Sequence, residues 1–216
     1  MEPAHVLAFA AATAREAGAL LLDYFGRELE ITTKSSAIDL VTSADRAAEA
    51  LIIERVRARF PDHGVLAEES GQAVTGADQR APQWIIDPLD GTTNFAHKLP
   101  HFCVSIALED QDGALVGVVH DPARGETFTA TRGGGAWLES AITGARQRLR
   151  VSDCASLGAA VLATGFSYAR ARPPSDPAWV DNLAEFVAVT PRLRGVRRAG
   201  SAALDLAYVA AGRLDG

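Results

Sequence analysis

The segment 84–94, W-I-I-D-P-L-D-G-T-T-N, combines residue types that can bind metal ions and an anion. Three apolar residues lead into Asp87 and Asp90, and the rigid ring of Pro88 restricts the turn that carries both acids. Carboxylate oxygens are the hard ligands that Mg²⁺ prefers. Backbone N–H groups after Gly91 can face an anion, helped by the positive end of a following helix. The segment therefore predicts a metal and phosphate site at the end of a buried strand.

Each half of this motif also has a purely structural interpretation. Asp-Pro often ends a strand and Asp-Gly often forms a turn, in both cases without a ligand. Two acids at the end of an apolar strand, however, lose stability through mutual repulsion and desolvation. A bound cation is the simplest compensation, so we interpret Asp87 and Asp90 as metal ligands.

A second acidic pair follows another short apolar run. Residues 64–70 read G-V-L-A-E-E-S, so Glu68 and Glu69 come directly after a predicted strand. If this strand lies beside 84–86 in one sheet, Glu68 or Glu69 meets Asp87 at the same edge. Such a gathering of carboxylates suits a two-metal site. The alternative is that both glutamates are solvated loop residues.

The histidines do not compete with these acids as ligands. Of the five, only His97 and His101 have a ligand-like spacing, and Pro100 between them disfavours the helix that such a pair needs. We interpret all five as structural or surface residues. Oxygen ligands without Cys or His favour Mg²⁺ or Mn²⁺ over Zn²⁺, and no Ser, Cys or His nucleophile is indicated.

The chain resembles the inositol monophosphatase family, within the Mg²⁺-dependent, lithium-sensitive sugar-phosphatase superfamily. The likeness runs from near the N-terminus to the last residue. The matching segments are K-S-S-A-I-D-L-V-T-S-A-D at 34–45, A-E-E-S at 67–70, W-I-I-D-P-L-D-G-T-T-N-F at 84–95, L-P-H-F-C-V-S-I-A-L at 99–108 and G-S-A-A-L-D-L-A-Y-V-A-A-G at 200–212. The resemblance implies one domain over 1–216 with a five-layer αβαβα sandwich. Its N-terminal half would span about 1–145 and its C-terminal half about 146–216, with the site between them.

The resemblance also implies a set of metal ligands. Glu68 would bind the first of two or three Mg²⁺ ions, and Asp87 would bridge metals. The Leu89 carbonyl would add a ligand, and Asp90 would serve the second metal. Together the ions would neutralise a phosphate monoester, which carries about two negative charges, and would activate a water.

Further roles follow from the same resemblance. Thr92, paired with Asp45, would orient the attacking water, so that Glu68, Thr92 and Asp45 form the catalytic group. The backbone of Gly91 and Thr92 would hold the phosphate. Four other residues would contact the substrate. Gly200, Ser201 and Ala202 are consecutive, and Lys34 lies on a loop that closes over the site.

One segment that the family pattern leads us to expect is missing from the sequence. The last metal ligand of the family is an Asp in a W-D-x-A-like segment after the 200–212 helix, and the sequence ends at Gly216 before it. A substrate-facing acid of the same region is missing too. We interpret the sequence as C-terminally truncated. The alternative is a protein that lacks part of its second metal shell, with lower metal affinity and rate.

The family resemblance also implies that the protein forms a homodimer and is inhibited by lithium.

Composition narrows the class of protein. With 48% hydrophobic and 22% charged residues, the 216-residue chain is typical of a packed globular protein. The net charge of −6 argues against a protein dominated by non-specific nucleic-acid binding. Cys103 and Cys154 alone make a disulfide framework improbable and fit a reducing cytoplasm. Arg15 and Glu16 interrupt the apolar stretch 6–22, which therefore predicts neither a signal peptide nor a membrane span.

Periodicity and turn residues predict a layered α/β protein. We expect helices over 3–25, from Thr42 or Ser43 to Pro61, over 179–190 and over 201–211. The segment 70–82 is expected to be a loop. Strands are expected at 30–33, 39–41, 64–67, 84–87, 102–108, 115–120, 126–130, 136–138, 146–151, 159–164 and 195–198.

Four arginines, at 192, 194, 197 and 198, fall within seven residues. A solvated strand face or a subunit contact is our interpretation, since charge runs are usually surface features. The alternative is an edge that recognises anions, either substrate phosphate or RNA, because a bacterial branch of the family is associated with ribosomal-RNA transcription complexes.

The leading hypothesis is a cytoplasmic, Mg²⁺-dependent phosphatase of a small polyol or sugar phosphate, with myo-inositol 1-phosphate as the expected substrate. Histidinol phosphate, fructose 1,6-bisphosphate and 3′-phosphoadenosine phosphates are alternative substrates within the same chemistry. The alternative of another class is a non-catalytic regulator that binds RNA or protein and retains the metal site.

Overall fold

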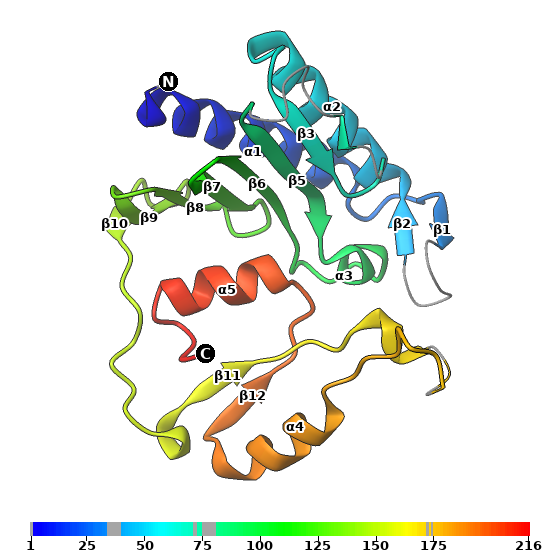
Figure 1. The fold of residues 1–216 in the computed structure, drawn as a ribbon, viewed down its shortest axis with the longest axis vertical. Coiled ribbons are helices and arrows are strands. Elements are labelled where there is room, and N and C mark those ends of the chain that lie inside the picture. Colours follow the sequence, from blue (N-terminus) through cyan, green and yellow to red (C-terminus); the bar gives the residue numbers. More distant parts are fainter. Residues whose placement is uncertain (1, 34–39, 71–72, 75–80, 172, 174) are drawn as a thin grey trace.

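The elements stack in five layers, in the order α-β-α-β-α (Figure 1). The computed structural model describes residues 2–33, 40–70, 73–74, 81–171, 173 and 175–216. Helices α1 (Pro3–Tyr24) and α2 (Ser43–Arg59) cover one face of a large sheet, and α5 (Ala202–Ala210) covers the other. A small sheet of β11 (Val161–Ala163) and β12 (Gly195–Arg197) follows, and α4 (Leu183–Val189) forms the outermost layer. The predicted αβαβα sandwich is confirmed, while the border between its halves near residue 145 stays a prediction.

The large sheet has eight strands in the order β10-β9-β8-β7-β6-β5-β3-β4. Its described pairs are antiparallel except that β3 and β5 run parallel. The strands are β3 (Gly64–Ala67), β4 (Ala73–Val74), β5 (Gln83–Asp90), β6 (Cys103–Asp110), β7 (Gly113–Asp121), β8 (Glu126–Thr131), β9 (Gly135–Ser140) and β10 (Arg146–Arg148). The remaining elements are the antiparallel pair β1 (Ile31–Thr33) and β2 (Leu40–Thr42), the helix α3 (Thr92–Ala96), and three short 3₁₀ helices at Leu157–Ala159, Tyr168–Ala171 and Thr190–Arg192.

The main core lies between the sheet and the first two helices. Helix α1 buries Val6, Ala10, Ala14, Ala17 and Leu21, a spacing of three or four residues that forms one helical face. Against this face the sheet, its loops and the residues after β5 contribute large, fully buried side chains, among them Trp84, Phe95, Phe102, Ile106 and Leu108. By length and composition α1 could cross a membrane, but that is weak evidence because the core helix of a globular protein has the same character.

His120 shows how closely α1 approaches the sheet. A Cβ at Gly18 would lie 2.6 Å from the His120 ring, so only glycine fits at this position. The Nδ1 atom of His120 lies 3.0 Å from Thr127 Oγ1, and burial lowers the pKa of the ring to about 4. His120 is therefore a neutral structural histidine, as we predicted.

Three predictions of local structure are wrong in detail. The helix expected over 179–190 begins only at Leu183, because Asp181 Oδ1 accepts the Leu183 N–H at 2.8 Å and Asn182 donates to Gly165 O at 2.8 Å. Such side-chain bonds to the backbone compete with helix formation. The strand expected over 146–151 ends at Arg148, since Leu149 turns into the core beneath α5. The expected loop over 70–82 contains the two-residue strand β4, which is too short to leave a periodic signal.

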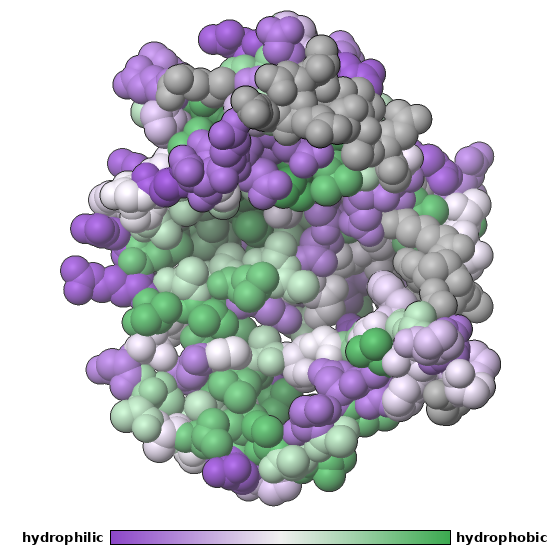
Figure 2. Space-filling model, in the orientation of Figure 1, coloured by the Kyte–Doolittle hydropathy of each residue, from purple (hydrophilic) through white to green (hydrophobic). Residues whose placement is uncertain are grey.

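Hydrophobic residues gather on one face of the molecule beside α5 and the large sheet (Figure 2). A groove of about 320 Å³ lies there, lined by residues of β6 to β9 and α5, Val119 and Phe128 among them, and by Leu149 after β10. Leu206 on α5 is 72% exposed, whereas Leu204 is fully buried. Within the described residues, α5 therefore buries one side of its surface and leaves the other uncovered.

Candidate active site

The ends of β3 and β5 bring two acidic segments to one edge of the sheet. The strands are parallel with Ala67 opposite Ile86, and the Glu68 N–H donates to Ile86 O at 3.2 Å. The expected pairing of 64–67 with 84–86 is confirmed. Glu68 consequently follows the end of β3, and Asp87 lies on the neighbouring strand just before the register shift between Asp87 and Asp90. Ligand-binding groups are typical of this edge of parallel strands.

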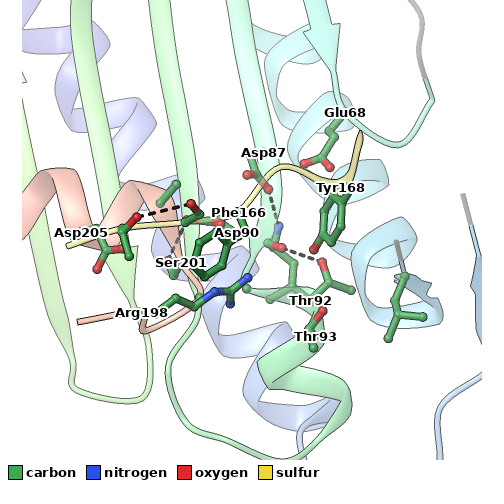
Figure 3. Close-up of a pocket in the computed structure, with 17 residues that line it drawn as sticks. Glu68, Asp87, Asp90, Thr92, Thr93, Phe166, Tyr168, Arg198, Ser201 and Asp205 are labelled. Atoms are coloured by element: carbon green, nitrogen blue, oxygen red, sulfur yellow. Dashed lines mark hydrogen bonds between the residues drawn. The ribbon is translucent and has the colours of Figure 1, made fainter. Parts of the chain in front are cut away.

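A pocket of about 240 Å³ lies at this edge, between the large sheet and α5 (Figure 3). One wall comes from the ends of β3 and β5 and from α3, and the other comes from residues 164–168 and from the segment that leads into α5. Of the predicted site residues, the pocket is lined by Glu68, Asp87, Leu89, Asp90, Gly91, Thr92, Gly200, Ser201 and Ala202. Lys34 lies outside the described residues, and Glu69 lines a different pocket beside α2.

Asp87 is the most strongly perturbed acid of the pocket. Its pKa is raised to about 9, chiefly because the carboxyl is buried, and further because the charges of Glu68 and Asp90 repel its ionised form. A hydrogen bond with Glu68 acts in the same direction, while the Leu89 N–H, 3.1 Å from Asp87 Oδ1, opposes the shift. A divalent cation would relieve this repulsion, so the donor chemistry fits Mg²⁺.

In this conformation, however, the acids do not form a complete set of metal ligands. Among the described residues, no three His, Cys, Asp or Glu side chains are close enough together to enclose a metal ion. Asp87 interacts with Glu68 through a hydrogen bond and through charge, and with Asp90 through charge, which acts over a longer range than direct ligation. Metal binding would therefore require these side chains to move closer together.

Asp90 joins the strand end to α5. Its Oδ2 atom accepts hydrogen bonds from Ser201 Oγ at 2.7 Å and from the Ala203 N–H at 2.6 Å. Ser201 is also the N-cap of α5, because its Oγ accepts the Leu204 N–H. All these contacts to Asp90 use Oδ2, so Oδ1 is the atom that could bind a cation.

Cys103 lies behind this junction as a buried free thiol. Its Sγ is 3.9 Å from Asp90 Oδ2, and burial raises the pKa of the thiol well above its usual value. A protonated, inaccessible thiol is not a nucleophile.

Thr92, which lines the pocket, meets Asp45, a predicted catalytic residue that is fully buried behind Thr92 and does not itself line the pocket. Thr92 Oγ1 lies 3.0 Å from Asp45 Oδ1 and 3.0 Å from the Leu89 carbonyl, and its single proton can bond only one of them at a time. Asp45 Oδ2 accepts the Thr42 N–H at 2.8 Å and Thr42 Oγ1 at 2.6 Å. Thr42, rather than Ser43, is thus the N-cap of α2, in a capping box with Asp45. Burial raises the pKa of Asp45, which is fully buried.

Gly91 provides the turn between β5 and α3. Its φ of 101° is a left-handed conformation, and a Cβ would lie 2.9 Å from the His101 carbonyl oxygen. The following helix has only five residues, so its dipole contributes less than the sequence led us to expect. An anion in this pocket would depend mainly on individual N–H groups.

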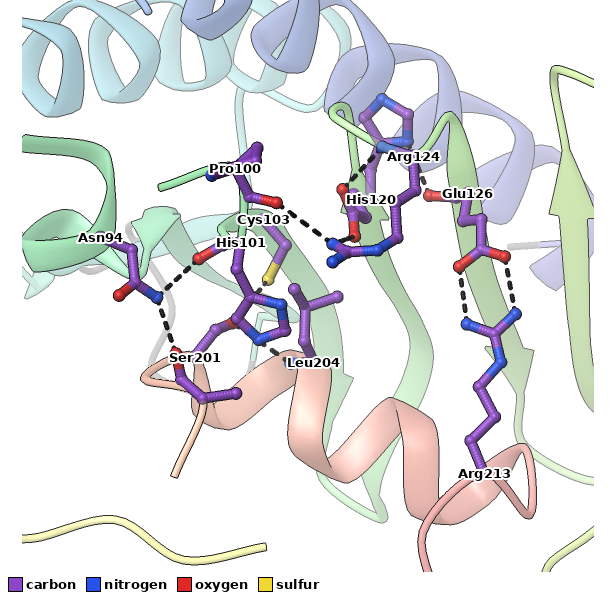
Figure 4. A network of polar contacts seen from close by, with 12 residues as sticks. Asn94, Pro100, His101, Cys103, His120, Arg124, Glu126, Ser201, Leu204 and Arg213 are labelled. Atoms are coloured by element: carbon purple, nitrogen blue, oxygen red, sulfur yellow. Dashed lines mark hydrogen bonds and ion pairs between the residues drawn. The ribbon is translucent and has the colours of Figure 1, made fainter. Parts of the chain in front are cut away.

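Asn94 holds the two walls of the pocket together (Figure 4). Its side-chain amide donates to His101 O at 2.8 Å and to Ala199 O at 2.9 Å. The second bond fixes the residue next to Gly200, whose φ is 92°. A Cβ at Gly200 would lie 3.0 Å from the Asn94 amide nitrogen, so this close approach requires glycine.

Sequence reasoning missed several lining residues, above all Arg198 and Asp205. The sequence pattern groups Arg198 with three other arginines, interpreted as a surface or subunit contact with recognition of an anion as the alternative. Arg198 lines the pocket, whereas Arg197 lines a separate one with Arg124 and Arg213. Burial raises the pKa of Asp205, Asp90 raises it further and Arg198 lowers it. The position of Asp205, four residues after Ser201 and so on the same helical face, could have indicated it. The described lining contains no histidine.

Comparison with known proteins agrees with this geometry. The model of the inositol monophosphatase family matches residues 2–216. An inositol-1-monophosphatase of Synechocystis is 48% identical over 200 residues, which cover 93% of this chain and 65% of the relative. The Nus factor SuhB of Pasteurella multocida is 46% identical over 213 residues, covering 98% and 74%. The crystal structure of the extragenic suppressor protein suhB from Bartonella henselae has a TM-score of 0.84 and 40% identity, covering 97% and 76%.

The chain thus spans about two thirds to three quarters of the length of these relatives. Both the match along the sequence and the match of the fold extend over nearly all of its residues. The chain belongs to the inositol monophosphatase family.

Proposed function

We propose that this protein is a Mg²⁺-dependent phosphomonoesterase that acts on a small polyol or sugar phosphate, with myo-inositol 1-phosphate as the favoured substrate. The observation that carries the proposal is the convergence of Glu68, Asp87, Asp90 and Thr92 on one pocket, in which burial and then the acidic neighbours disfavour the ionised form of Asp87. Glu68, Asp87, Asp90 and the Leu89 carbonyl would hold the ions. Mn²⁺ would replace Mg²⁺ at the same oxygen ligands.

Bound divalent ions would neutralise the phosphate and lower the pKa of a water. The residues of the chain then have the task of placing that water. When Thr92 Oγ1 donates a hydrogen bond to Asp45 Oδ1, the lone pairs of Oγ1 can accept a hydrogen bond from the water. This bond orients the water. Asp45, whose pKa is raised by burial, is suited to receive a proton passed through Thr92.

The other wall of the pocket favours a hydroxylated alcohol. At about 240 Å³ the pocket is smaller than typical sites for drug-sized ligands, which start at roughly 300 Å³. Arg198 offers only hydrogen-bond donors and Asp205 offers acceptors. A hydroxyl group of the substrate could therefore accept a hydrogen bond from Arg198 or donate one to Asp205. A compact polyol phosphate fits this size and polarity. By the family resemblance, we extend the proposal to a cytoplasmic, lithium-sensitive homodimer.

The test is phosphate release from myo-inositol 1-phosphate by the purified 216-residue chain, with Mg²⁺ and with EDTA. Histidinol phosphate, fructose 1,6-bisphosphate and 3′-phosphoadenosine phosphate complete the panel, and the Asp87→Asn variant is the control for contaminating phosphatases. We expect Mg²⁺-dependent turnover that is fastest with the inositol ester and absent in Asp87→Asn. No turnover of any ester at saturating Mg²⁺ would contradict the proposal.

A second candidate function is a regulator that binds RNA or protein. It is favoured by the relatives named Nus factor SuhB, which are 43–46% identical to this chain. Arg197, which lines a pocket with Arg124 and Arg213, is the first residue to test. An RNA contact through these arginines would weaken with salt, would survive Asp87→Asn and would fail in Arg197→Gln. RNA binding that is unchanged by salt and by Arg197→Gln would argue against an RNA contact through these arginines.

A further inference from the structure

Glu49 of α2 is a buried acid that the proposed chemistry does not use. Only 5% of the residue is exposed. Oε2 accepts the Glu69 N–H at 2.7 Å, and Oε1 accepts the Ser70 N–H at 2.9 Å. One carboxylate thus holds two consecutive peptide groups, with hydrogen bonds that its charge strengthens.

These two peptide groups come directly after Glu68. On the other side, the Glu68 N–H is bound to Ile86 O of β5 at 3.2 Å. The backbone of Glu68 is therefore held by the sheet at its own N–H and by α2 at the next two residues. Loss of Glu49 would remove both of these hydrogen bonds from α2 to the backbone that follows Glu68.

Glu49 does not itself reach the active-site pocket. It lines a separate pocket on the outer side of the 68–70 segment, together with Arg46 and Arg57. Its contacts to that segment are made to the backbone. Its effect on the site must therefore act through the position of Glu68.

We propose that Glu49 is a positioning residue, which holds Glu68 where it can join Asp87 in binding a divalent cation. The inference rests on the proposed function, because it requires a cation site at Glu68 and Asp87. Groups that orient metal ligands typically change metal affinity by about 10- to 100-fold when they are removed.

The experiment measures Mn²⁺ binding by the full chain, by calorimetry or by electron paramagnetic resonance, without substrate. Glu49→Ala removes both acceptors, and Glu49→Gln keeps one oxygen but turns an amide N–H₂ toward a backbone N–H. Glu54→Gln is the matched control, because it removes one negative charge from the same helix at a side chain that is 77% exposed. We expect the Kd for Mn²⁺ to rise about 10-fold or more in both Glu49 variants and to stay within about twofold in Glu54→Gln.

A second readout separates positioning from general stability. The increase in unfolding temperature on adding Mn²⁺ should be smaller in the Glu49 variants than in the wild type, whatever their stability in EDTA. If Glu49→Ala does not fold, Glu49→Gln decides. Wild-type Mn²⁺ affinity in a folded Glu49→Gln variant would overturn this inference alone. No Mn²⁺ binding by the wild-type chain would overturn the proposed function and this inference with it.

Discussion

Replacing Asp87 by asparagine should stabilise the metal-free protein while it removes the proposed activity. In the folded chain Asp87 keeps its proton up to about pH 9, whereas an ordinary Asp loses it near 3.8. Between these values the unfolded chain binds fewer protons than the folded chain, so the stability of the wild type falls as pH rises. The asparagine side chain carries no titratable proton, and its oxygen can still accept the Leu89 N–H.

The size of the effect follows from this window. Each pH unit between the unfolded and folded pKa values costs at most about 1.4 kcal/mol for one group. At pH 7 that gives an upper bound of roughly 4 kcal/mol. Part of the repulsion comes from Glu68, which is exposed to solvent, and solvent screening reduces this part. We therefore expect a gain of about 1–3 kcal/mol for Asp87→Asn at pH 7 in EDTA.

The assay is urea unfolding of the wild type and Asp87→Asn at pH 5, 7 and 8.5, each in EDTA and in Mg²⁺. The wild type should lose stability from pH 5 to 8.5 in EDTA and regain it in Mg²⁺, while the variant should show a flatter profile and no response to Mg²⁺. A variant that is less stable than the wild type at pH 8.5 in EDTA would refute the reasoning.

Four further predictions concern the same pocket. Thr92→Val should lower kcat for myo-inositol 1-phosphate by about 100-fold or more, because the water loses its orienting group, and leave the Kd for Mn²⁺ unchanged; normal steady-state turnover would disprove that role. Asp90→Asn should abolish hydrolysis and cost only about 1–2 kcal/mol of stability in urea unfolding, since its oxygen can still accept one bond from α5; near-normal activity would contradict its assignment as a ligand. Gly91→Ala should cost at least about 1–3 kcal/mol in thermal unfolding, because its φ is 101° and a Cβ would collide with the His101 carbonyl; an unchanged Tm would be inconsistent with that turn. Arg198→Gln should raise KM for the inositol ester about tenfold without changing the unfolding midpoint, and an unchanged KM would place Arg198 outside the substrate site.

Local sequence patterns predicted most helices and strands, because the apolar spacing and turn residues that favour each element lie close together in the chain. The strand expected over 64–67 is β3, and the apolar spacing of 3–25 gives α1 to within one residue. The failures at Asp181 and Asn182 arise where a polar side chain can bond water, a neighbouring backbone group or a distant one. Sequence spacing does not indicate which partner is chosen.

The sequence by itself determined which residues have the chemistry for a metal and phosphate site, since Glu68, Asp87 and Asp90 each follow an apolar run that ends in a turn. Only the tertiary structure decided how they are combined. Thr92 meets Asp45 across 47 positions, and Ser201 meets Asp90 across 111. It also placed Arg198 in the pocket and set Glu49 behind Glu68. These contacts depend on strand order and on the crossing of helices over the sheet, and many distant residues jointly set that arrangement through the packing of the core.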